Sequence, residues 1–246
     1  MIQLASLNQQ QPLDSMTLVA VIDTALCIGA GGSSGSLADK PIIRNAEGKL
    51  VIPASQLKGR LRHECEKLTR ALGWDTCESP TAATMCPQRA GLPGNFQRNE
   101  YDIGDRHPDG SARHHCLICQ IFGNPSLPSS ILFDDLICTE NPQHLPAVLR
   151  PGVTINRRRH TAEEKKLYFL ETSPANANLR FVGSITLQPN APAFAKALLL
   201  AGLHHIHALG GSKSAGLGWL HWEFLDTQPS KVSDEDWIFL KQGGAP

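Results

Sequence analysis

Four of the seven cysteines lie between residues 77 and 119, and their spacing is typical of a metal site. Cys116 and Cys119 form a C-x2-C pair, which can grip a zinc ion from a tight turn. Cys77 and Cys86 supply a second pair upstream, with a wider spacing than a usual zinc knuckle. Because four thiolates complete a tetrahedral structural site, we expect these four cysteines to hold one structural Zn²⁺.

The segment around these cysteines would need a bound metal ion to hold it in a defined structure. Residues 74–130 are rich in proline, glycine, asparagine and charged residues, and they show no sustained apolar period. A structureless stretch of this length is unusual inside a compact domain, and metal binding can supply folding free energy. We therefore predict a cysteine-rich, zinc-binding insertion over residues 74–130. The alternatives are that His114 or His115 replaces a cysteine as a ligand, or that the cysteines are ordinary reduced thiols.

Asp39 is the candidate for carboxylate chemistry. It follows a loop rich in glycine and serine, residues 29–38, and precedes a proline-marked turn. Such a loop has little packing value, because glycine loses much conformational entropy on ordering and serine buries little apolar surface. No paired carboxylate motif and no serine–histidine–aspartate arrangement lies near Asp39 in the sequence. Its position alone therefore favours a turn or cap residue over a catalytic one.

A second glycine-rich segment, GGSKSAGLG at residues 210–218, could cradle phosphates through its backbone N–H groups. Lys213 would add a positive charge there. The segment matches neither the P-loop nor the dinucleotide-binding fingerprint, because it lacks a terminal Gly-Lys-Ser/Thr and a following helix. The alternative is a turn at the entry to a strand.

A basic helix is predicted over residues 55–73, with apolar residues at helical spacing on one face. Ser55 is suited to cap its start, and Gly73 is suited to end it. The basic residues of its first turns are Lys58, Arg60 and Arg62. Cations near a helix N-terminus are unfavourable unless an anion lies nearby, so this pattern favours a phosphate partner. A solvated face is the alternative.

The remaining elements indicate an α+β domain built on an antiparallel sheet. We expect strands at 16–28, 129–138 and 180–188, two short strands within 40–55, a helix at 194–209, and a last strand after residue 218. Residues 150–170 predict two strands that flank a charged tip. From Arg150 to Lys166 the sequence has six lysines or arginines against two glutamates.

The composition, with 41% apolar and 19% charged residues over 246 residues, is that of a globular protein. Lysine plus arginine number 23, as do aspartate plus glutamate, so any nucleic acid must be met by a local basic patch. The first residues lack the charged and apolar regions of a signal peptide, and no apolar stretch predicts a membrane span. We expect a cytoplasmic protein without a membrane partner, with Cys27, Cys65 and Cys138 in its core.

Three motifs follow one another along the sequence: IPASQLKGRLR, then CLICQIFG followed by SSILFDD, and finally LGGSKSAGLGW. In these motifs and in their order, the sequence resembles the RAMP superfamily of CRISPR-associated proteins. The sequence is most similar to the backbone subunit that polymerises along the guide RNA in type III effector complexes. The cysteine-rich insertion resembles that of zinc-bearing type III-D and type III-E-like variants. The resemblance implies a ferredoxin-like, RNA-recognition-motif fold in a single domain over residues 1–246, with an inserted thumb hairpin at residues 150–172.

The resemblance also implies a function and its residues. Asp39 matches the aspartate that cleaves complementary target RNA at regular intervals, with Mg²⁺ or Mn²⁺, at nucleotides flipped out by the thumb. The RNA-binding positions that it implies are Lys40, Arg44, Ser55, Lys58, Arg60, Arg62, Arg157, Arg158, Arg159, Gly211, Ser212 and Lys213. The implied partners are guide RNA, target RNA, other RAMP backbone subunits and further type III subunits.

Two departures from the family pattern concern these positions: alanine precedes Asp39 where a bulkier aliphatic residue is usual, and the helix begins PASQLKG where the family has glycine before paired serines. Two alternative functions stay open. One is a non-catalytic guide-binding scaffold. The other is a guide-RNA processing nuclease of the same superfamily, which would need an acid–base set such as His205 and His207 near the glycine-rich loop.

Overall fold

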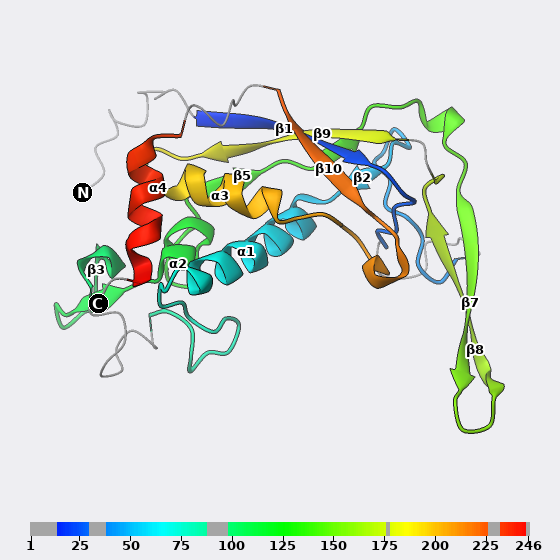
Figure 1. Ribbon diagram of the computed structural model, residues 1–246, viewed down its shortest axis with the longest axis horizontal. Coiled ribbons are helices and arrows are strands. Elements are labelled where there is room, and N and C mark those ends of the chain that lie inside the picture. The colour runs from blue at the N-terminus through cyan, green and yellow to red at the C-terminus, as the bar shows by residue number, and fades with distance from the viewer. Residues whose placement is uncertain (1–13, 30–37, 88–97, 176–177, 226–231, 245–246) are drawn as a thin grey trace.

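An antiparallel sheet forms the centre of the computed structural model, which describes residues 14–29, 38–87, 98–175, 178–225 and 232–244 (Figure 1). Its strands follow the order β10-β1-β9-β6-β2, and β5 pairs with β9. They are β1 (Asp14–Ile22), β2 (Val51–Ile52), β5 (Ile131–Phe133), β6 (Leu136–Cys138), β9 (Leu179–Leu187) and β10 (Leu220–Phe224). The glycine- and serine-rich loop at residues 30–37 lies outside the described residues. The predicted α+β class with an antiparallel sheet is confirmed.

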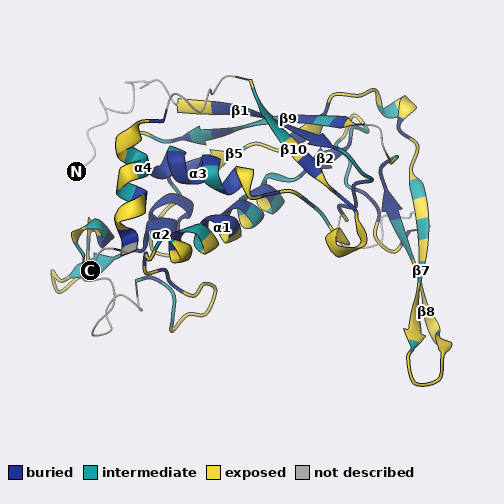
Figure 2. Ribbon diagram, in the orientation of Figure 1, coloured by how far each residue is buried: buried dark blue, intermediate teal, exposed yellow. Residues whose placement is uncertain are grey.

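Three helices cover one side of this sheet: α1 (Ala54–Ala71), α2 (Leu117–Phe122) and α3 (Ala195–His204) (Figure 1). In β1, Met16 is fully buried and every residue from Leu18 to Ile22 is buried, so this central strand is covered on both faces over its second half. The helices turn their buried sides toward the sheet (Figure 2). The core therefore lies between the sheet and these helices. No helix within the described ranges combines the length and the apolar character of a membrane span.

Helix α1 confirms the predicted helix but not its cap. Leu57, Leu61 and Cys65 are fully buried along its inner face. Gly73 has a φ of +83° after the last turn, and the N–H of Trp74 donates to the carbonyl of Thr69 at 3.0 Å, so the chain leaves the helix through a left-handed glycine.

The predicted cap at Ser55 is wrong. The helix begins at Ala54, whose N–H donates to Oδ1 of Asp135 at 2.7 Å, and no side chain of the first turn is acidic. Asp135 lies between β5 and β6, far away in the sequence, so local sequence patterns could not reveal it. It is also an anion beside the helix N-terminus, which removes the need to invoke a phosphate for that reason alone.

The cysteine-rich segment is more regular than its sequence suggested. It contains a small hairpin of β3 (Asp102–Arg106) and β4 (Ala112–His114), and then α2, whose six residues are all buried. A helix buried on every side has no apolar period, which is why the sequence pattern missed it. Residues 88–97 of this segment lie outside the described residues.

A long two-stranded hairpin projects from the body of the molecule (Figure 1). It is formed by β7 (Val148–Asn156) and β8 (Thr161–Thr172), close to the predicted bounds of 150–172. Gly152 lies opposite Tyr168, and a Cβ at Gly152 would stand 2.3 Å from the tyrosine ring. The glycine therefore provides the space in which this ring crosses the hairpin.

A last helix, α4 (Asp234–Lys241), was not predicted. Its signal is present in the sequence, since the side chain of Ser233 accepts a hydrogen bond from the N–H of Asp236, as in other serine-capped helices. The helix packs Phe239 against Trp74 with a ring separation of 5.1 Å. It thereby joins the C-terminal part of the chain to the start of the cysteine-rich segment.

Candidate metal centre and nucleic-acid interface

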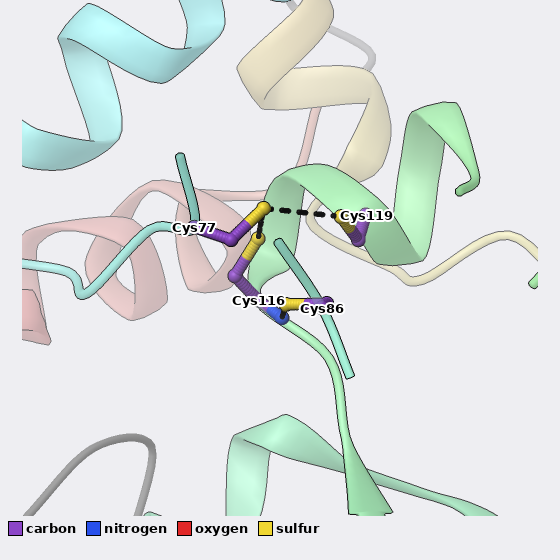
Figure 3. Close-up of side chains that lie close together, drawn as sticks. All are labelled: Cys77, Cys86, Cys116 and Cys119. Carbon is purple, nitrogen blue, oxygen red and sulfur yellow. Dashed lines mark hydrogen bonds between the residues drawn. The ribbon is translucent and has the colours of Figure 1, made fainter. Parts of the chain in front are cut away.

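The four cysteines predicted to bind a metal converge on one point (Figure 3). All four are buried, none forms a disulfide, and their sulfur atoms lie within 4.8 Å of one another. The Sγ of Cys77 lies 3.5 Å from that of Cys119 and 3.7 Å from that of Cys116. Tetrahedral zinc with Zn–S bonds of about 2.3 Å requires sulfurs about 3.8 Å apart. The set therefore fits a tetrahedral metal ion, consistent with structural zinc.

Helix α2 positions the second cysteine pair. Cys116 precedes its first residue, and Cys119 lies in its first turn, so the C-x2-C pair turns both sulfurs to one side. The N–H of Cys116 donates to Sγ of Cys86 at 3.3 Å. Hydrogen bonds with neighbouring thiols, Cys116 foremost, lower the pKa of Cys77 and of Cys119. Hydrogen bonds with Cys119 and Cys77 raise the pKa of Cys116. At Cys86 the hydrogen bond with Cys116 acts to lower the pKa, but those with Cys119 and Cys77 act in the opposite direction and the pKa is raised. In the metal-free cluster the thiolate form is therefore favoured at Cys77 and Cys119 and the thiol form at the other two.

The rival histidine ligands do not join the cluster in the described part of the chain. His115 is fully buried, with Nε2 3.1 Å from a carboxylate oxygen of Asp105 and Nδ1 2.9 Å from the side-chain amide of Asn124. Burial lowers the pKa of His115, although Asp105 acts in the opposite direction. Both ring nitrogens thus have partners, so His115 stabilises the segment beside Cys116.

A cavity of about 390 Å³ brings together the two loops that the sequence singled out. The predicted site residues in its wall are Asp39, Lys40, Gly211 and Ser212, and the other lining residues are Cys27, Gly29, Gln56 and Leu170. Four parts of the chain thus meet here: the segment after β1, the start of α1, the base of β8 and the glycine-rich loop. The cavity is the point at which the predicted catalytic and phosphate-binding segments adjoin.

Asp39 fastens its loop to the hairpin. Its Oδ2 accepts a hydrogen bond from the N–H of Phe169 at 2.7 Å, and its own N–H donates to the carbonyl of Phe169 at 3.0 Å. The carbonyl of Lys40 accepts from the N–H of Glu171 at 3.2 Å. Asp39 is exposed, and within the described residues its second carboxylate oxygen has no hydrogen-bond partner. One oxygen is thus structural and the other is free for a ligand.

The glycine-rich loop packs its backbone closely against the segment after β1. The N–H of Gly211 donates to the carbonyl of Cys27 at 2.7 Å, and a Cβ at Gly218 would lie 1.8 Å from the carbonyl of Leu209. The Nζ of Lys213 reaches the carbonyl of Gly210 at 3.0 Å and stays exposed. Glycine is required here by close backbone approach, which holds Ser212 in the cavity wall, with Lys213 next to it in the chain.

Not every predicted basic residue faces this cavity. Arg44 donates to the carbonyls of Gly48 and Leu145, at 2.9 Å and 3.2 Å. Arg60 pairs with Glu64 at 2.8 Å, and Arg62 pairs with Glu66 at 3.1 Å. These three guanidinium groups are engaged within the protein.

Lys58 and the hairpin tip differ from these arginines. Lys58 has no ion-pair partner in the described ranges, and burial lowers its pKa, with a smaller effect from nearby Arg62. Arg157, Arg158 and Arg159 are exposed in the turn between β7 and β8, at the opposite end of the hairpin from Leu170, which lines the cavity. Of the predicted RNA-binding residues, Lys40, Gly211 and Ser212 thus lie at the cavity, and the three arginines lie at the tip.

Sequence reasoning missed four residues of the cavity wall, of which Gly29 begins the glycine- and serine-rich loop. Cys27 was assigned to the core, and it is buried, but it also lines the cavity. Gln56 lies between Ser55 and Lys58, which were both predicted to bind RNA, so its position in the sequence could have indicated that it belongs to the site. Leu170 gave none, because its place depends on how the base of β8 packs on the loop of Asp39.

A family model for the RAMP superfamily matches residues 20–221. The chain belongs to the RAMP superfamily. No curated protein matches the sequence at a significant level. The match begins near the end of β1 and covers the helices α1 to α3, the hairpin and the glycine-rich loop. Membership in this superfamily supports a CRISPR-associated, RNA-binding role, and it includes both nucleases and other proteins.

Proposed function

We propose that this RAMP protein is a guide-RNA-binding backbone subunit of a type III CRISPR effector complex. The observation that carries the proposal is the cavity in which Asp39 and Lys40 meet Gly211 and Ser212. A carboxylate, a cation and a close-packed glycine loop suit contact with a ribonucleotide backbone. The cytoplasmic setting and the partner subunits belong to this proposal.

The strand order supports the ferredoxin-like part of the proposal. Following the chain through β1, α1, β6, β9, α3 and β10 gives two β-α-β units, and their strands lie in the sheet in the order β10-β1-β9-β6. This is the interleaved arrangement of the split β-α-β fold. The cysteine-rich segment and the hairpin of β7 and β8 are then insertions into that frame, in one domain.

The hairpin suits a role as the thumb. The strand alternation and the Val153–Leu167 pair place Leu149, Val153 and Leu167 on one face, and all three are at least two-fifths exposed. Ile155, beyond an irregularity in the register, is 55% exposed. Apolar side chains on a projecting ribbon can wedge between stacked bases, and the arginine tip can contact phosphates. The hairpin thus offers both the wedge and the charge that intercalation into a guide–target duplex requires.

Two residues near the start of α1 complete the proposed guide surface. Ser55 is exposed in the first turn, and Lys58 follows one turn later without an ion pair in the described part of the chain. The neighbouring Gln56 lines the cavity. A phosphate at this point would contact the lysine and the exposed serine hydroxyl, since Asp135 already accepts from the N–H of Ala54 at the helix end.

Target cleavage by Asp39 is the catalytic part of the proposal. The free carboxylate oxygen could bind Mg²⁺ or Mn²⁺, or orient a ribose 2′-hydroxyl for in-line attack on the adjacent phosphate. The hydrogen bond from Phe169 favours a second candidate, a scaffold in which Asp39 only holds the hairpin base. His205 and His207, required by a processing nuclease, are absent from the cavity wall.

A cleavage assay separates these functions. The guide-loaded complex is incubated with end-labelled complementary RNA in Mg²⁺, Mn²⁺ or EDTA, with wild type beside Asp39→Asn. Asparagine retains an oxygen that can accept from Phe169, so the hairpin base is preserved while the charge is lost. Asp109→Asn, in an exposed turn of the insertion, is the matched control. We expect metal-dependent cuts in wild type and in the control, and no cuts in Asp39→Asn, with RNA binding unchanged in all three. If wild type leaves the target intact, or if wild type and Asp39→Asn cut it equally, cleavage by Asp39 is refuted and the non-catalytic scaffold is the function that stands.

A further inference from the structure

Arg62 extends from α1 toward the four cysteines and not toward solvent. Its side chain is 21% exposed. One terminal nitrogen donates to the carbonyl of Gly123 at 3.0 Å, and the other lies 3.7 Å from Sγ of Cys119. Its Nε donates to Glu66 at 3.1 Å, which fixes the plane of the guanidinium. The side chain therefore connects α1, the end of α2 and one sulfur of the cluster.

The contact between Arg62 and Cys119 would compensate negative charge at the metal cluster. Four thiolates around one divalent ion leave two negative charges in a buried site, and burying net charge is costly unless it is compensated. A guanidinium beside Sγ supplies a positive charge and an N–H donor at the cluster. Groups that hydrogen-bond to metal ligands fix their orientation and strengthen metal binding.

Gly123 fixes the orientation of the Arg62 guanidinium, because its carbonyl accepts a hydrogen bond from it. It has a φ of +77° at the end of α2, and a Cβ there would lie 2.7 Å from the N–H nitrogen of Ser129. The backbone is therefore fixed where it offers its carbonyl to Arg62. A lysine could replace the charge, but it could not reach this carbonyl and the sulfur with a rigid planar group.

We propose that Arg62 is a positioning residue of the metal centre, which holds Cys119 in its ligating orientation and offsets the negative charge of the cluster. The inference rests on the proposed zinc site. It assigns Arg62 a role at the metal in place of the guide-phosphate contact expected from the sequence. Arg60, two residues earlier, pairs with Glu64 and makes no contact with a cysteine, so it serves as a matched control.

The test measures zinc retention by the full chain, with a chelator of known affinity competing for the metal. Zinc-loaded wild type, Arg62→Gln, Arg62→Lys and Arg60→Gln are compared at equal folded content, judged by circular dichroism. We expect Arg62→Gln to lose roughly ten- to a hundredfold in zinc affinity. Arg62→Lys should fall between, and Arg60→Gln should stay within about twofold of wild type.

A second readout keeps the test independent of any loss of folding. Replacing zinc with Co²⁺ gives a visible spectrum that reports tetrahedral thiolate ligation, and we expect Arg62→Gln to alter its sulfur charge-transfer band while Arg60→Gln leaves it unchanged. An Arg62→Gln protein with wild-type zinc affinity and spectrum would overturn the role of Arg62. A wild-type chain that binds no zinc would overturn the metal centre itself, and with it this inference.

Discussion

At the scale of single residues, the metal centre and Asp39 show two ways in which side chains organise this protein. The cysteines join segments that lack an extensive core of their own, and His115 and Gln120 fasten the chain beside them through buried hydrogen bonds. Asp39 joins a loop to the hairpin base through one oxygen and keeps the other available. The thiols can bind a metal and the carboxylate of Asp39 can bind a ligand, and both also join separate segments of the chain.

Removing two of the cysteines should release the metal and destabilise the fold. We expect a Cys116→Ser/Cys119→Ser double variant to contain no zinc, where wild type contains about one equivalent per chain, and to unfold at a lower temperature. Structural metal sites contribute directly to folding free energy. Elemental analysis and thermal unfolding measure both effects. Cys138→Ser, a buried cysteine outside the cluster, is the control, and equal metal content in the double variant would refute the site.

At the scale of elements, close packing and cross-strand pairs fix the sheet and its helices. Gly202 on α3 faces α1, where a Cβ would lie 2.7 Å from Sγ of Cys65 and 2.8 Å from Cδ1 of Leu61. On the solvent face of the sheet, Arg180 of β9 and Glu223 of β10 form a two-fold ion pair. Each contact gives a prediction that is local to its element.

Gly202→Ala should destabilise the protein although alanine favours helices. Overpacking a core costs about 1–3 kcal/mol, whereas the gain in helix propensity is at most about 1 kcal/mol. Gly59→Ala on α1 is the matched control, because a Cβ there meets nothing within 4 Å. We expect urea unfolding to show a lower stability for Gly202→Ala and a higher one for Gly59→Ala. A stabilised Gly202→Ala protein would contradict the observed helix packing.

The ion pair on the sheet should be visible in an acid titration. The guanidinium of Arg180 lowers the pKa of Glu223 below its ordinary value. A lowered carboxyl pKa stabilises the fold above the unfolded value, roughly pH 4.3, and this contribution is lost as the pH falls through the folded value. Carboxyl carbon NMR should show the low midpoint. Arg180→Gln should return it toward the ordinary value, and an unchanged midpoint would show that the pair does not persist in solution.

The sequence predicted those elements whose causes are local. The apolar spacing of α1 and the glycine at its end gave its extent nearly to the residue, and the hairpin followed from its charged tip. The cap by Asp135 and the wall residue Leu170 were out of reach, because both depend on long-range packing. Arg62 showed the same limit, since a basic residue in a basic helix gives no sign that it turns inward to a sulfur.

At the scale of the whole molecule, the chain has zero net charge, and two groups of its described cations lie where the proposed RNA path would pass. The tip of the hairpin, with its three arginines, lies far from the body (Figure 1). Lys40 lines the cavity, and Lys213 follows the lining residue Ser212 in the chain. Several other arginines are neutralised inside the protein. RNA is therefore expected to follow a path past the cavity, within reach of the hairpin, and not to coat the surface generally.

Mapping where RNA contacts the chain tests this expectation most directly. The guide-loaded complex is assembled on RNA that carries photoreactive uridines, irradiated, and digested for mass spectrometry of crosslinked peptides. We predict crosslinks in the peptides that contain Lys40, Lys213 and Arg157–Arg159. Crosslinks confined to the solvent face of the sheet around Leu132 and Ile137, with none at the cavity or the hairpin, would contradict the proposed RNA-binding surface.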